Sequence, residues 1–194
     1  MSDEGVFQVR FHGRGGQGVV TSAELLSVAA FLDGREAQAF PSFGSERMGA
    51  PVMAFCRVAD VPIRVREPVA EPDAVVVADA TLLHHVQLFA GLGEEGYALI
   101  NSTRSWDELG LAEMTRRHFL ERLTTIPATD IARRHTGRPL PNVCLLGGLA
   151  ALTRVVSIDA LDRAVRERFA GAVAEGNVAA ARAAYDRIRS VLHA

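Results

Sequence analysis

The sequence predicts an α/β fold: a three-layer αβα sandwich with a mostly parallel or mixed sheet and a helical C-terminal part. Short apolar segments with the period of strands alternate with helical patterns through the first two thirds of the chain. Ala74–Ala78 (AVVVA) is an unbroken apolar run, which is typical of a strand covered on both faces. From Val143 onward only helical patterns follow, so the last third adds helices to a complete sheet.

The first unit consists of a strand, a glycine-rich loop and a helix. Val6–His12 alternates apolar and polar side chains, as a half-buried strand does. Val19–Leu32 has its apolar side chains on one helical face, and Gly34 is placed to end this helix. Arg35–Phe40 is the expected second strand.

The remaining elements follow from the same periods and from their Gly and Pro boundaries. Pro41–Pro51 is expected to be an irregular loop, and Gly137 is expected to end a short helix. Further strands are expected at Val52–Val58, Ala74–Ala78, Tyr97–Asn101 and Arg122–Pro127, with a short extended piece at Pro62–Val65. Further helices are expected at Thr81–Ala90, Trp106–Arg117, Asp130–His135, Val143–Arg154, Ile158–Phe169 and Ala174–Leu192. No repeat or linker interrupts this order, so residues 1–194 are expected to form one domain.

The composition excludes several classes of protein. The formal net charge is −2 at pH 7, which gives no long-range attraction to nucleic acid or to an anionic membrane. Every Lys/Arg position is arginine, so the chain lacks the lysine that Schiff-base chemistry or a P-loop requires. Cys56 and Cys144 are too few to hold an iron–sulfur cluster without another chain. We expect no signal peptide, no membrane span and a cytoplasmic location.

The loop between the first strand and the first helix carries the sharpest local signal. It has the pattern G-x-G-x-x-G and consists of Gly13, Arg14, Gly15, Gly16, Gln17 and Gly18. Glycines let backbone N–H groups approach a ligand closely, and the amino end of the next helix adds roughly half a positive charge. Such a loop can cradle a phosphate or another anion, and Arg14 would add a fork-shaped cationic donor.

Three interpretations of this loop stay open. It binds a phosphate-bearing group such as coenzyme A, it forms a tight turn at a subunit contact, or it binds NAD or FAD. A dinucleotide site needs an acidic residue at the end of the second strand to hold the ribose. That strand ends at Phe40 and Pro41, whereas Asp33 and Glu36 lie at its other end, which weakens the third interpretation.

Four other polar residues are ambiguous. Asp79 follows a buried strand, where sites of α/β proteins form, and it can equally cap the next helix. Asn142 can cap the helix that follows it or touch a ligand. His84 and His85 have no carboxylate or Cys partner at ligand spacing, so no metal site is predicted. No catalytic triad is predicted.

Four segments follow one another in an order that identifies a family. They are Arg10–Ala23 (RFHGRGGQGVVTSA), Ala37–Ile63 with its G-x-E-R-x-G-A-P loop, Glu71–Leu83 (E-P-D-x-V-V-V-x-D-x-x-L-L) and Pro141–Gly148 (PNVCLLGG). Together with the Ala-rich end, which includes Asn177 and Ala179–Tyr185, they resemble the gamma subunits of pyruvate and ketoisovalerate ferredoxin oxidoreductases. The resemblance covers nearly the whole chain.

The resemblance implies a subunit of a thiamine-diphosphate-dependent 2-oxoacid:acceptor oxidoreductase. Such a complex converts a 2-oxoacid and coenzyme A into an acyl-CoA and CO2, and iron–sulfur clusters pass the electrons to ferredoxin or another acceptor. Thiamine diphosphate, Mg2+ and the clusters are expected on partner subunits of the alpha, beta and delta types. This chain alone is expected to bind none of them and to be inactive, and no catalytic residue is assigned to it.

The resemblance also suggests that the second signature loop joins the glycine loop at the coenzyme A side of a shared site. Its expected contacts are Gly44, Glu46, Arg47 and Gly49, with Asn142 from the last segment. Glu46 and Arg47 can instead form a local salt bridge.

The alternatives to this interpretation differ in kind. Within the family, the pyruvate/ketoisovalerate type is favoured over the indolepyruvate type, whose second signature differs, and over phenylglyoxylate enzymes. Outside it stand a lone NAD- or FAD-binding module and a purely structural subunit whose loops only pack against partners.

Overall fold

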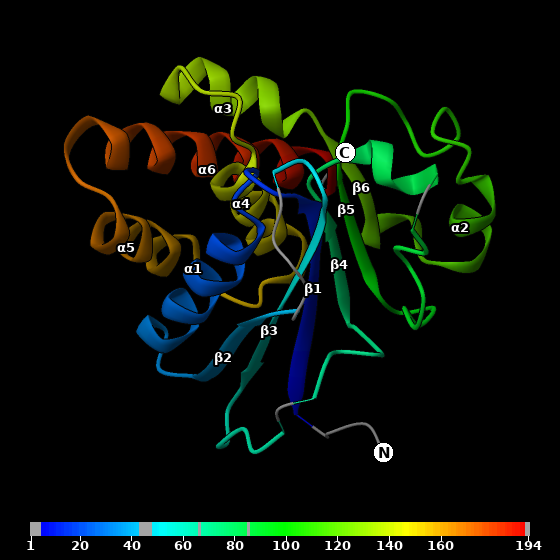
Figure 1. Cartoon of the computed structure of the whole chain (residues 1–194), viewed down its shortest axis with the longest axis horizontal. Coiled ribbons are helices and arrows are strands. Elements are labelled where there is room, and N and C mark those ends of the chain that lie inside the picture. Colours follow the sequence, from blue (N-terminus) through cyan, green and yellow to red (C-terminus); the bar gives the residue numbers. More distant parts are fainter. Residues whose placement is uncertain (1–4, 43–47, 66, 85, 193–194) are drawn as a thin grey trace.

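The computed structural model describes residues 5–42, 48–65, 67–84 and 86–192. Within them lies a six-stranded sheet with the order β2-β3-β1-β4-β5-β6 (Figure 1). The strands are β1 (Val6–Arg14), β2 (Glu36–Pro41), β3 (Pro51–Ala59), β4 (Ala74–Val77), β5 (Tyr97–Asn101) and β6 (Leu123–Ile126). Every expected strand is confirmed, whereas the extended piece at Pro62–Val65 belongs to no strand of the described sheet.

The sheet is mixed, with β1 at the junction of its two halves. β1 is parallel to β4, and β5 and β6 continue in the same direction. On its other side β1 is antiparallel to β3, which is also antiparallel to β2. The α/β fold class is therefore confirmed, and β1 is hydrogen-bonded along both edges.

Helices cover the two faces unequally (Figure 1). The longer helices are α1 (Val19–Leu32), α3 (Ala128–Thr136), α4 (Asn142–Thr153), α5 (Ile158–Arg168) and α6 (Gly171–Leu192). The short ones are α2 (Ala112–Arg117) and two 3-10 helices, η1 (Ala80–His84) and η2 (Leu120–Arg122). The longer helices share one core cluster with β1 and β3, and α4 and α6 pack against each other within it.

β4 shows that both faces of the sheet are covered. Its Ala74 and Val76 belong to the core cluster under the long helices, whereas Val75 and Val77 belong to a second cluster on the opposite face. The second cluster is completed by Leu82, Leu88, Ala98, Ile100, Trp106, Leu109 and Leu123. This confirms what the unbroken apolar run predicted.

Two expected helices on the second face are wrong in extent. The described residues of Thr81–Ala90 form the 3-10 helix η1 followed by turns, and Trp106–Arg117 is helical only from Ala112 onward. In the second case Gly110 adopts a left-handed conformation with φ +76°, which ends the turn before α2 begins. Trp106 and Leu109 lie in that turn and are buried in the second cluster.

A buried arginine explains the irregular chain in the first case. Arg10 on β1 is 6% exposed, and its guanidinium donates hydrogen bonds to four backbone carbonyls. These carbonyls belong to Val69, Ala70, Leu88 and Ala90, so the turns after η1 are shaped by a residue far away in sequence. A buried guanidinium needs such acceptors because an unsatisfied buried charge is costly.

His12 completes this arrangement by accepting a hydrogen bond from Nε of Arg10 at 3.1 Å. Burial, followed by the charge of Arg10, lowers the pKa of His12 to about 4. The ring is therefore neutral at pH 7, and a neutral imidazole has the lone pair that this bond requires.

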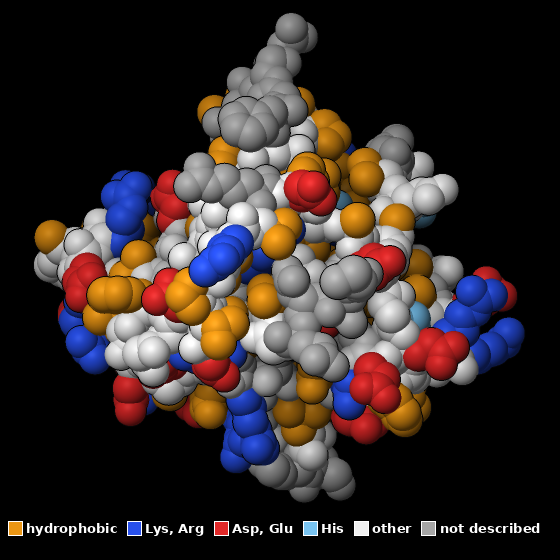
Figure 2. All heavy atoms as spheres, turned by 90° about the horizontal axis from the view of Figure 1, so that it is seen from below, with side chains coloured by type: hydrophobic (Ala, Val, Ile, Leu, Met, Phe, Trp, Pro, Cys, Tyr) orange, Lys and Arg blue, Asp and Glu red, His pale blue; other side chains and the backbone are white. Residues whose placement is uncertain are grey.

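The surface carries charges of both signs. In Figure 2, red and blue side chains are interspersed with small orange groups over the described part of the face, and neither sign dominates it. Within the described chain, no helix is both long enough and apolar enough to cross a bilayer.

Two adjacent glycines in α4 give a matched test of its packing against α6. A Cβ at Gly147 would stand 2.0 Å from the carbonyl oxygen of Ala181, whereas a Cβ at Gly148 would meet only side chains, the nearest being Leu99 at 3.2 Å. We expect Gly147→Ala to lower the free energy of unfolding by about 1–3 kcal/mol, because the backbone of α6 must move. Gly148→Ala should stay within about 1 kcal/mol of the wild type, because the gain in helix propensity offsets a small side-chain shift. Urea denaturation measures both, and equal losses would contradict the close approach of the two helices.

Candidate functional site

The topology of the sheet changes at the carboxyl ends of β1 and β4. After β1 the chain enters α1 under the first core cluster, whereas after β4 it enters η1 on the opposite face. The two neighbouring parallel strands thus send their chains to opposite faces, which is the position where open α/β sheets form ligand sites. The glycine loop Gly13–Gly18 and Asp79 both lie there.

The glycine loop is joined to the end of the second signature loop by backbone hydrogen bonds. Gly15 donates to the carbonyl of Ala50 at 2.9 Å, and Gly49 donates to the carbonyl of Gly15 at 3.1 Å. Gly15 also forms a parallel bridge with Met48. The structure therefore brings Gly49 against the glycine loop, whereas Gly44, Glu46 and Arg47 lie outside the described residues.

Gly18 is required for two independent physical reasons. Its φ is +73°, a conformation that residues with a Cβ rarely adopt. A Cβ at this position would also stand 2.5 Å from Nδ2 of Asn142. The amino ends of α1 and α4 approach each other at this contact, so two of the four segments that suggested the family meet in the fold.

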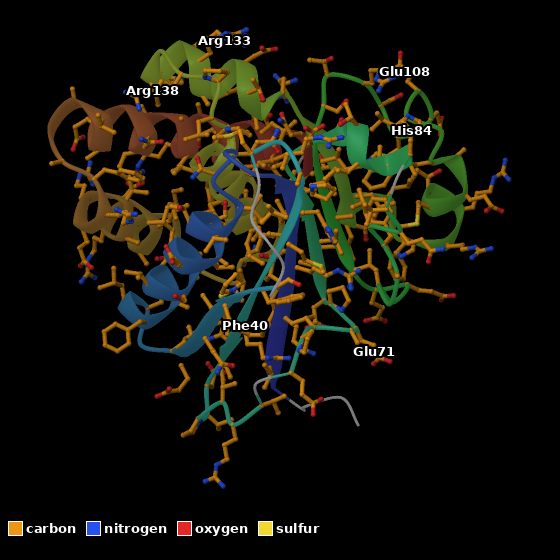
Figure 3. All side chains as sticks on the ribbon, in the orientation of Figure 1. Phe40, Glu71, His84, Glu108, Arg133 and Arg138 are labelled. Carbon is orange, nitrogen blue, oxygen red and sulfur yellow. The ribbon has the colours of Figure 1, made fainter. Side chains whose placement is uncertain are left out.

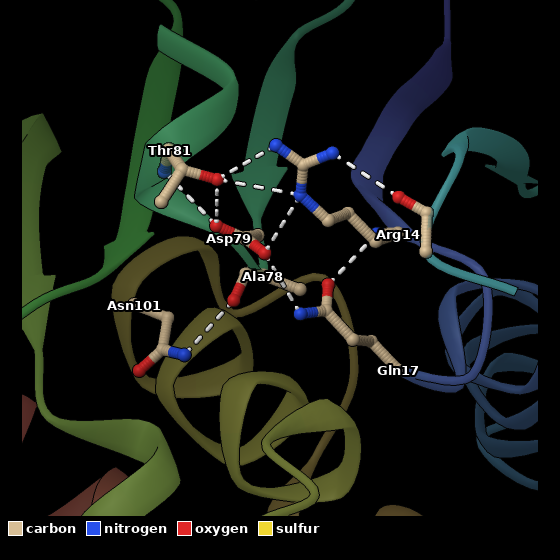
Figure 4. Close-up of polar contacts among 7 residues, drawn as sticks. Arg14, Gln17, Ala78, Asp79, Thr81 and Asn101 are labelled. Carbon is tan, nitrogen blue, oxygen red and sulfur yellow. Dashed lines mark hydrogen bonds and ion pairs between the residues drawn. The ribbon is translucent and has the colours of Figure 1, made fainter.

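Asp79 links the glycine loop to the chain that follows β4 (Figure 4). Its Oδ2 accepts hydrogen bonds from Nε of Arg14 at 3.2 Å and from Nε2 of Gln17 at 3.0 Å. Its Oδ1 accepts from the backbone N–H of Thr81 at 2.9 Å and from the Thr81 hydroxyl at 2.6 Å. The expected cap is therefore confirmed, because Asp79 caps η1, and the same side chain lies at the strand end beside the glycine loop.

Arg14 and Gln17 stabilise the loop itself. Oε1 of Gln17 accepts a hydrogen bond from the backbone N–H of Arg14 at 2.7 Å. The Arg14 guanidinium donates to Asp79, to Thr81 and to the carbonyl of Gly49 at 3.1 Å. Its positive charge is thus already partnered within the loop, and an anionic ligand at this place would have to share it.

The pKa of Asp79 is lowered by this set of donors. Burial alone would raise it, but the hydrogen bonds from Thr81 and Gln17 and the charge of Arg14 outweigh burial. The carboxylate is ionised at neutral pH and already accepts four hydrogen bonds. It is therefore a structural anion of the loop and not a poised proton donor.

A groove of about 300 Å3 lies over the amino end of α1. No side chain caps this helix, and its first turn holds no acidic residue. The first amides of a helix have no partner within it, and they carry the positive end of the helix dipole. The groove is lined among others by Arg14, Gly16, Gly18, Thr21, Asn142 and Arg168.

Asn142 is the buried polar group of this groove. It is 3% exposed, and its Oδ1 accepts no hydrogen bond from the described residues. Its side chain forms no cap hydrogen bond with α4, so the interpretation of Asn142 as a helix cap is wrong. A buried amide oxygen without a donor is costly, and a ligand that donates to it would remove this cost.

A second hollow of about 300 Å3 adjoins the first and shares Leu140, Asn142 and Phe169 with it. It lies between the end of α3 and the start of α6 and is lined also by Arg138 and Val173. Figure 3 shows Arg138 beside α3 and α6, well away from His84 on η1. The two hollows thus adjoin each other at these three residues, and each is lined by at least one arginine.

The strand order opposes the dinucleotide interpretation. β2 is separated from β1 by β3, so its end does not lie beside the glycine loop as a ribose-binding strand would. Asp33 accepts hydrogen bonds from the backbone N–H and hydroxyl of Ser157, at the other end of α1. It has a structural partner there and is remote from the loop.

Comparison with known proteins decides the family. Residues 8–187 match the family model described as pyruvate ferredoxin/flavodoxin oxidoreductase. This chain belongs to that family. The match spans the glycine loop, Asp79 and Asn142, so all parts of the described site lie inside the family domain.

Relatives of the family match the chain over nearly all of its length. Pyruvate synthase subunit PorC of Methanothermobacter marburgensis is 47% identical over 184 residues, which are 95% of this chain and 98% of that protein. The pyruvate/ketoisovalerate oxidoreductases common subunit gamma of Pyrococcus furiosus is 44% identical over 94% of this chain and 97% of its own. The resemblance to gamma-type subunits is therefore confirmed.

A crystal structure supports the same fold. The pyruvate oxidoreductase subunit PORC of Thermotoga maritima is similar with a TM-score of 0.79 and 33% identity, over 94% of this chain and 96% of that one. The fold predicted from the sequence is thus found in a solved member of this family.

The cysteines of this oxidoreductase family member do not fit an iron–sulfur cluster. Cys56 lies on β3 and Cys144 on α4, and both are buried and free. Burial raises the pKa of both thiols, that of Cys144 to about 12, so neither is a thiolate at neutral pH. Within the described residues, no three His, Cys, Asp or Glu side chains are grouped as metal ligands. His85 lies outside those residues.

Arg168 and Phe169 line the groove but have no sequence signal of their own. Arg168 stands in the last turn of α5, where a basic side chain is common because it complements the helix dipole. Only the packing of α5 against α1 brings it to the amino end of α1.

The depressed pKa of Asp79 predicts a pH-dependent contribution to stability. The ionised carboxylate stabilises the fold above its unfolded-state pKa of about 3.9, and this contribution is lost as the pH falls through the folded-state value. The loss caused by Asp79→Asn should therefore be larger at about pH 7 than at about pH 3, as measured by urea denaturation. Asp186→Asn, an exposed carboxylate on α6, is the control and should change little at either pH. An Asp79→Asn effect of the same size at both pH values would contradict the assignment.

Proposed function

We propose that this chain is the gamma subunit of a thiamine-diphosphate-dependent 2-oxoacid:acceptor oxidoreductase complex. The complex would convert a 2-oxoacid and coenzyme A into an acyl-CoA and CO2 and pass the electrons to ferredoxin or another acceptor. The family match and the near-complete coverage of relatives called PorC or gamma subunits support this proposal. Their names favour pyruvate or ketoisovalerate as the 2-oxoacid over an aromatic one.

The chain's own contribution would be the groove at the amino end of α1, on the coenzyme A side of the shared site. The observation that carries this role is the unpartnered Oδ1 of Asn142, buried at the wall of a groove that also holds an uncapped helix end. A helix end and Arg168 suit a phosphate, and a buried amide oxygen suits an N–H or O–H donor. Coenzyme A carries both kinds of group.

The two adjoining hollows suit an elongated ligand. The hollow at α1 continues past Leu140 and Phe169 into the hollow at α3 and α6. The shared apolar side chains of Leu140 and Phe169, with arginines lining each hollow, suit a molecule with separated phosphates and a less polar arm.

The reacting groups would belong to partner subunits of the alpha, beta and delta types. This chain has two buried cysteines and no described cluster of metal ligands, so the iron–sulfur clusters, Mg2+ and thiamine diphosphate are proposed to be bound elsewhere in the complex. Thiamine diphosphate supplies the carbanion chemistry when bound. The role of this chain is then to orient coenzyme A and not to move protons at the reacting carbon.

Arg168→Gln tests the phosphate contact. We expect the purified complex to show a KM for coenzyme A raised on the order of tenfold, with the KM for the 2-oxoacid unchanged, because a charge-assisted contact is lost. Coenzyme A-dependent viologen reduction measures both constants. Arg163→Gln, on the exposed side of the same helix and outside the groove, is the matched control. Equal coenzyme A kinetics in both variants would remove Arg168 from the site.

Asn142→Leu separates ligand binding from a packing role. Leucine keeps the branched shape and removes the buried unpartnered oxygen, so the chain should be as stable as the wild type or more stable. The KM for coenzyme A should still rise several-fold. A complex that loses subunits on gel filtration, yet keeps its coenzyme A kinetics where assembly survives, would favour the purely structural alternative.

A further inference from the structure

A second arginine-lined cavity lies at the opposite end of the sheet from the glycine loop. It has a volume of about 390 Å3. Tyr97 begins β5, Arg122 precedes β6, and Arg154 follows α4, so the cavity adjoins the amino ends of the strands. Arg189 and Leu192 of the last turns of α6 also line it.

The cavity has an excess of positive charge. Arg122, Arg154 and Arg189 line it, against a single carboxylate, that of the exposed Glu121. The three arginines come from three separate elements of the fold. Neither Arg154 nor Arg189 forms an ion pair with a described residue.

Arg122 is held in place by its neighbours. Its guanidinium lies 5.0 Å from the ring centre of Tyr97 and 5.3 Å from that of Phe119, and it donates a hydrogen bond to the carbonyl of Glu95. Its ion pair with the Glu95 carboxylate is long at 3.9 Å, and that carboxylate is 82% exposed, so the pair leaves most of the charge uncompensated. A planar donor held by two aromatic rings and a backbone carbonyl is pre-organised to bind an oxyanion.

Arg154 is held in an unfavourable backbone conformation. Its φ is +56°, and no other non-glycine residue of the described chain has a positive φ. The left-handed conformation costs roughly 1–2 kcal/mol for a residue with a Cβ, and glycine is the common residue where a helix ends in this way. The chain keeps an arginine at a position where glycine would be less strained.

The carboxyl ends of α4 and α6 offer a simpler explanation for two of these charges. A basic side chain in the last turn of a helix is favoured by the helix dipole. This explains Arg189 and Arg154 singly. It does not explain Arg122, which belongs to no long helix, nor the cavity that all three share.

The geometry points to a binding site for a small organic dianion, formed by Arg122, Arg154 and Arg189. The guanidinium groups would hold two charged oxygen groups, and Tyr97, Leu152 and Leu192 would contact a short hydrocarbon body. A dicarboxylate and a phosphate ester are two sources of this chemistry. The site is independent of the proposed coenzyme A groove, because the two share no lining residue.

The test is isothermal titration of the full chain at low ionic strength, with succinate as the dicarboxylate and inorganic phosphate as the bare anion. A lower Kd for succinate assigns the dicarboxylate class, and a lower Kd for phosphate assigns the phosphate ester class. Arg154→Gly and Arg189→Gln should each raise the Kd of the anion by about tenfold, because each removes one charge-assisted contact. Arg154→Gly should melt no lower than the wild type, because it relieves the backbone strain, so a binding loss cannot be attributed to unfolding.

Two controls keep the outcome unambiguous. Arg163→Gln lowers the net charge by the same amount at a position outside both cavities. Arg168→Gln removes the Arg168 charge from the groove at α1. Undiminished binding in Arg154→Gly and Arg189→Gln overturns the site and leaves the helix dipole as the explanation. Binding lost in Arg168→Gln alone also overturns it, because the anion would then occupy the other groove.

Discussion

The carboxylate of Asp79 accepts hydrogen bonds from both sides of the gap between β1 and β4. Arg14 and Gln17 reach it from the glycine loop, and Thr81 reaches it from the chain after β4. These two strands send their chains to opposite faces of the sheet, and the last backbone hydrogen bond between them runs from Ala78 to His12. Beyond it, the side chain of Asp79 joins the two chains. This ionised group therefore holds the loop on the β4 side, while the backbone hydrogen bonds of Gly15 with Gly49 and Ala50 hold it on the other side.

The groove follows from the same constraint. With the loop held by Asp79, Gly18 turns the chain into α1 with a free helix end, and Asn142 of α4 lies directly against that turn. The polarity of the groove is therefore set by backbone amides and one buried amide side chain more than by Arg14, whose charge is partnered. This explains how a loop with the glycine pattern of a nucleotide site can lack an acidic residue for a ribose.

Sequence patterns predicted the elements that depend on local order. Val19–Leu32 was predicted to its last residue, because its apolar period lies within the segment and Gly18 and Gly34 stand close to its two ends. The expected helix at Thr81–Ala90 failed because the carbonyls of Leu88 and Ala90 bind Arg10, which lies some 80 positions earlier. A local period carries no information about such a contact.

Some features of the candidate site likewise depend on local sequence, and others depend on contacts between distant segments. The sequence by itself determined the family, the glycine loop with its helix, the mixed or parallel α/β sheet and the absence of a cysteine set for a cluster, because these depend on motifs, periods and composition. Only the tertiary structure decided that Asp79 is the partner of Arg14 and that Arg168 reaches the amino end of α1. It also showed that Asn142 does not cap α4 and that its buried Oδ1 lines the groove without a hydrogen-bond donor. It also decided that Arg122, Arg154 and Arg189 share one cavity. The physical reason is that hydrogen-bond partners and cavity walls are chosen by the packing of elements distant in sequence, and the pairing of strands and the crossing of helices become known only when the chain is folded.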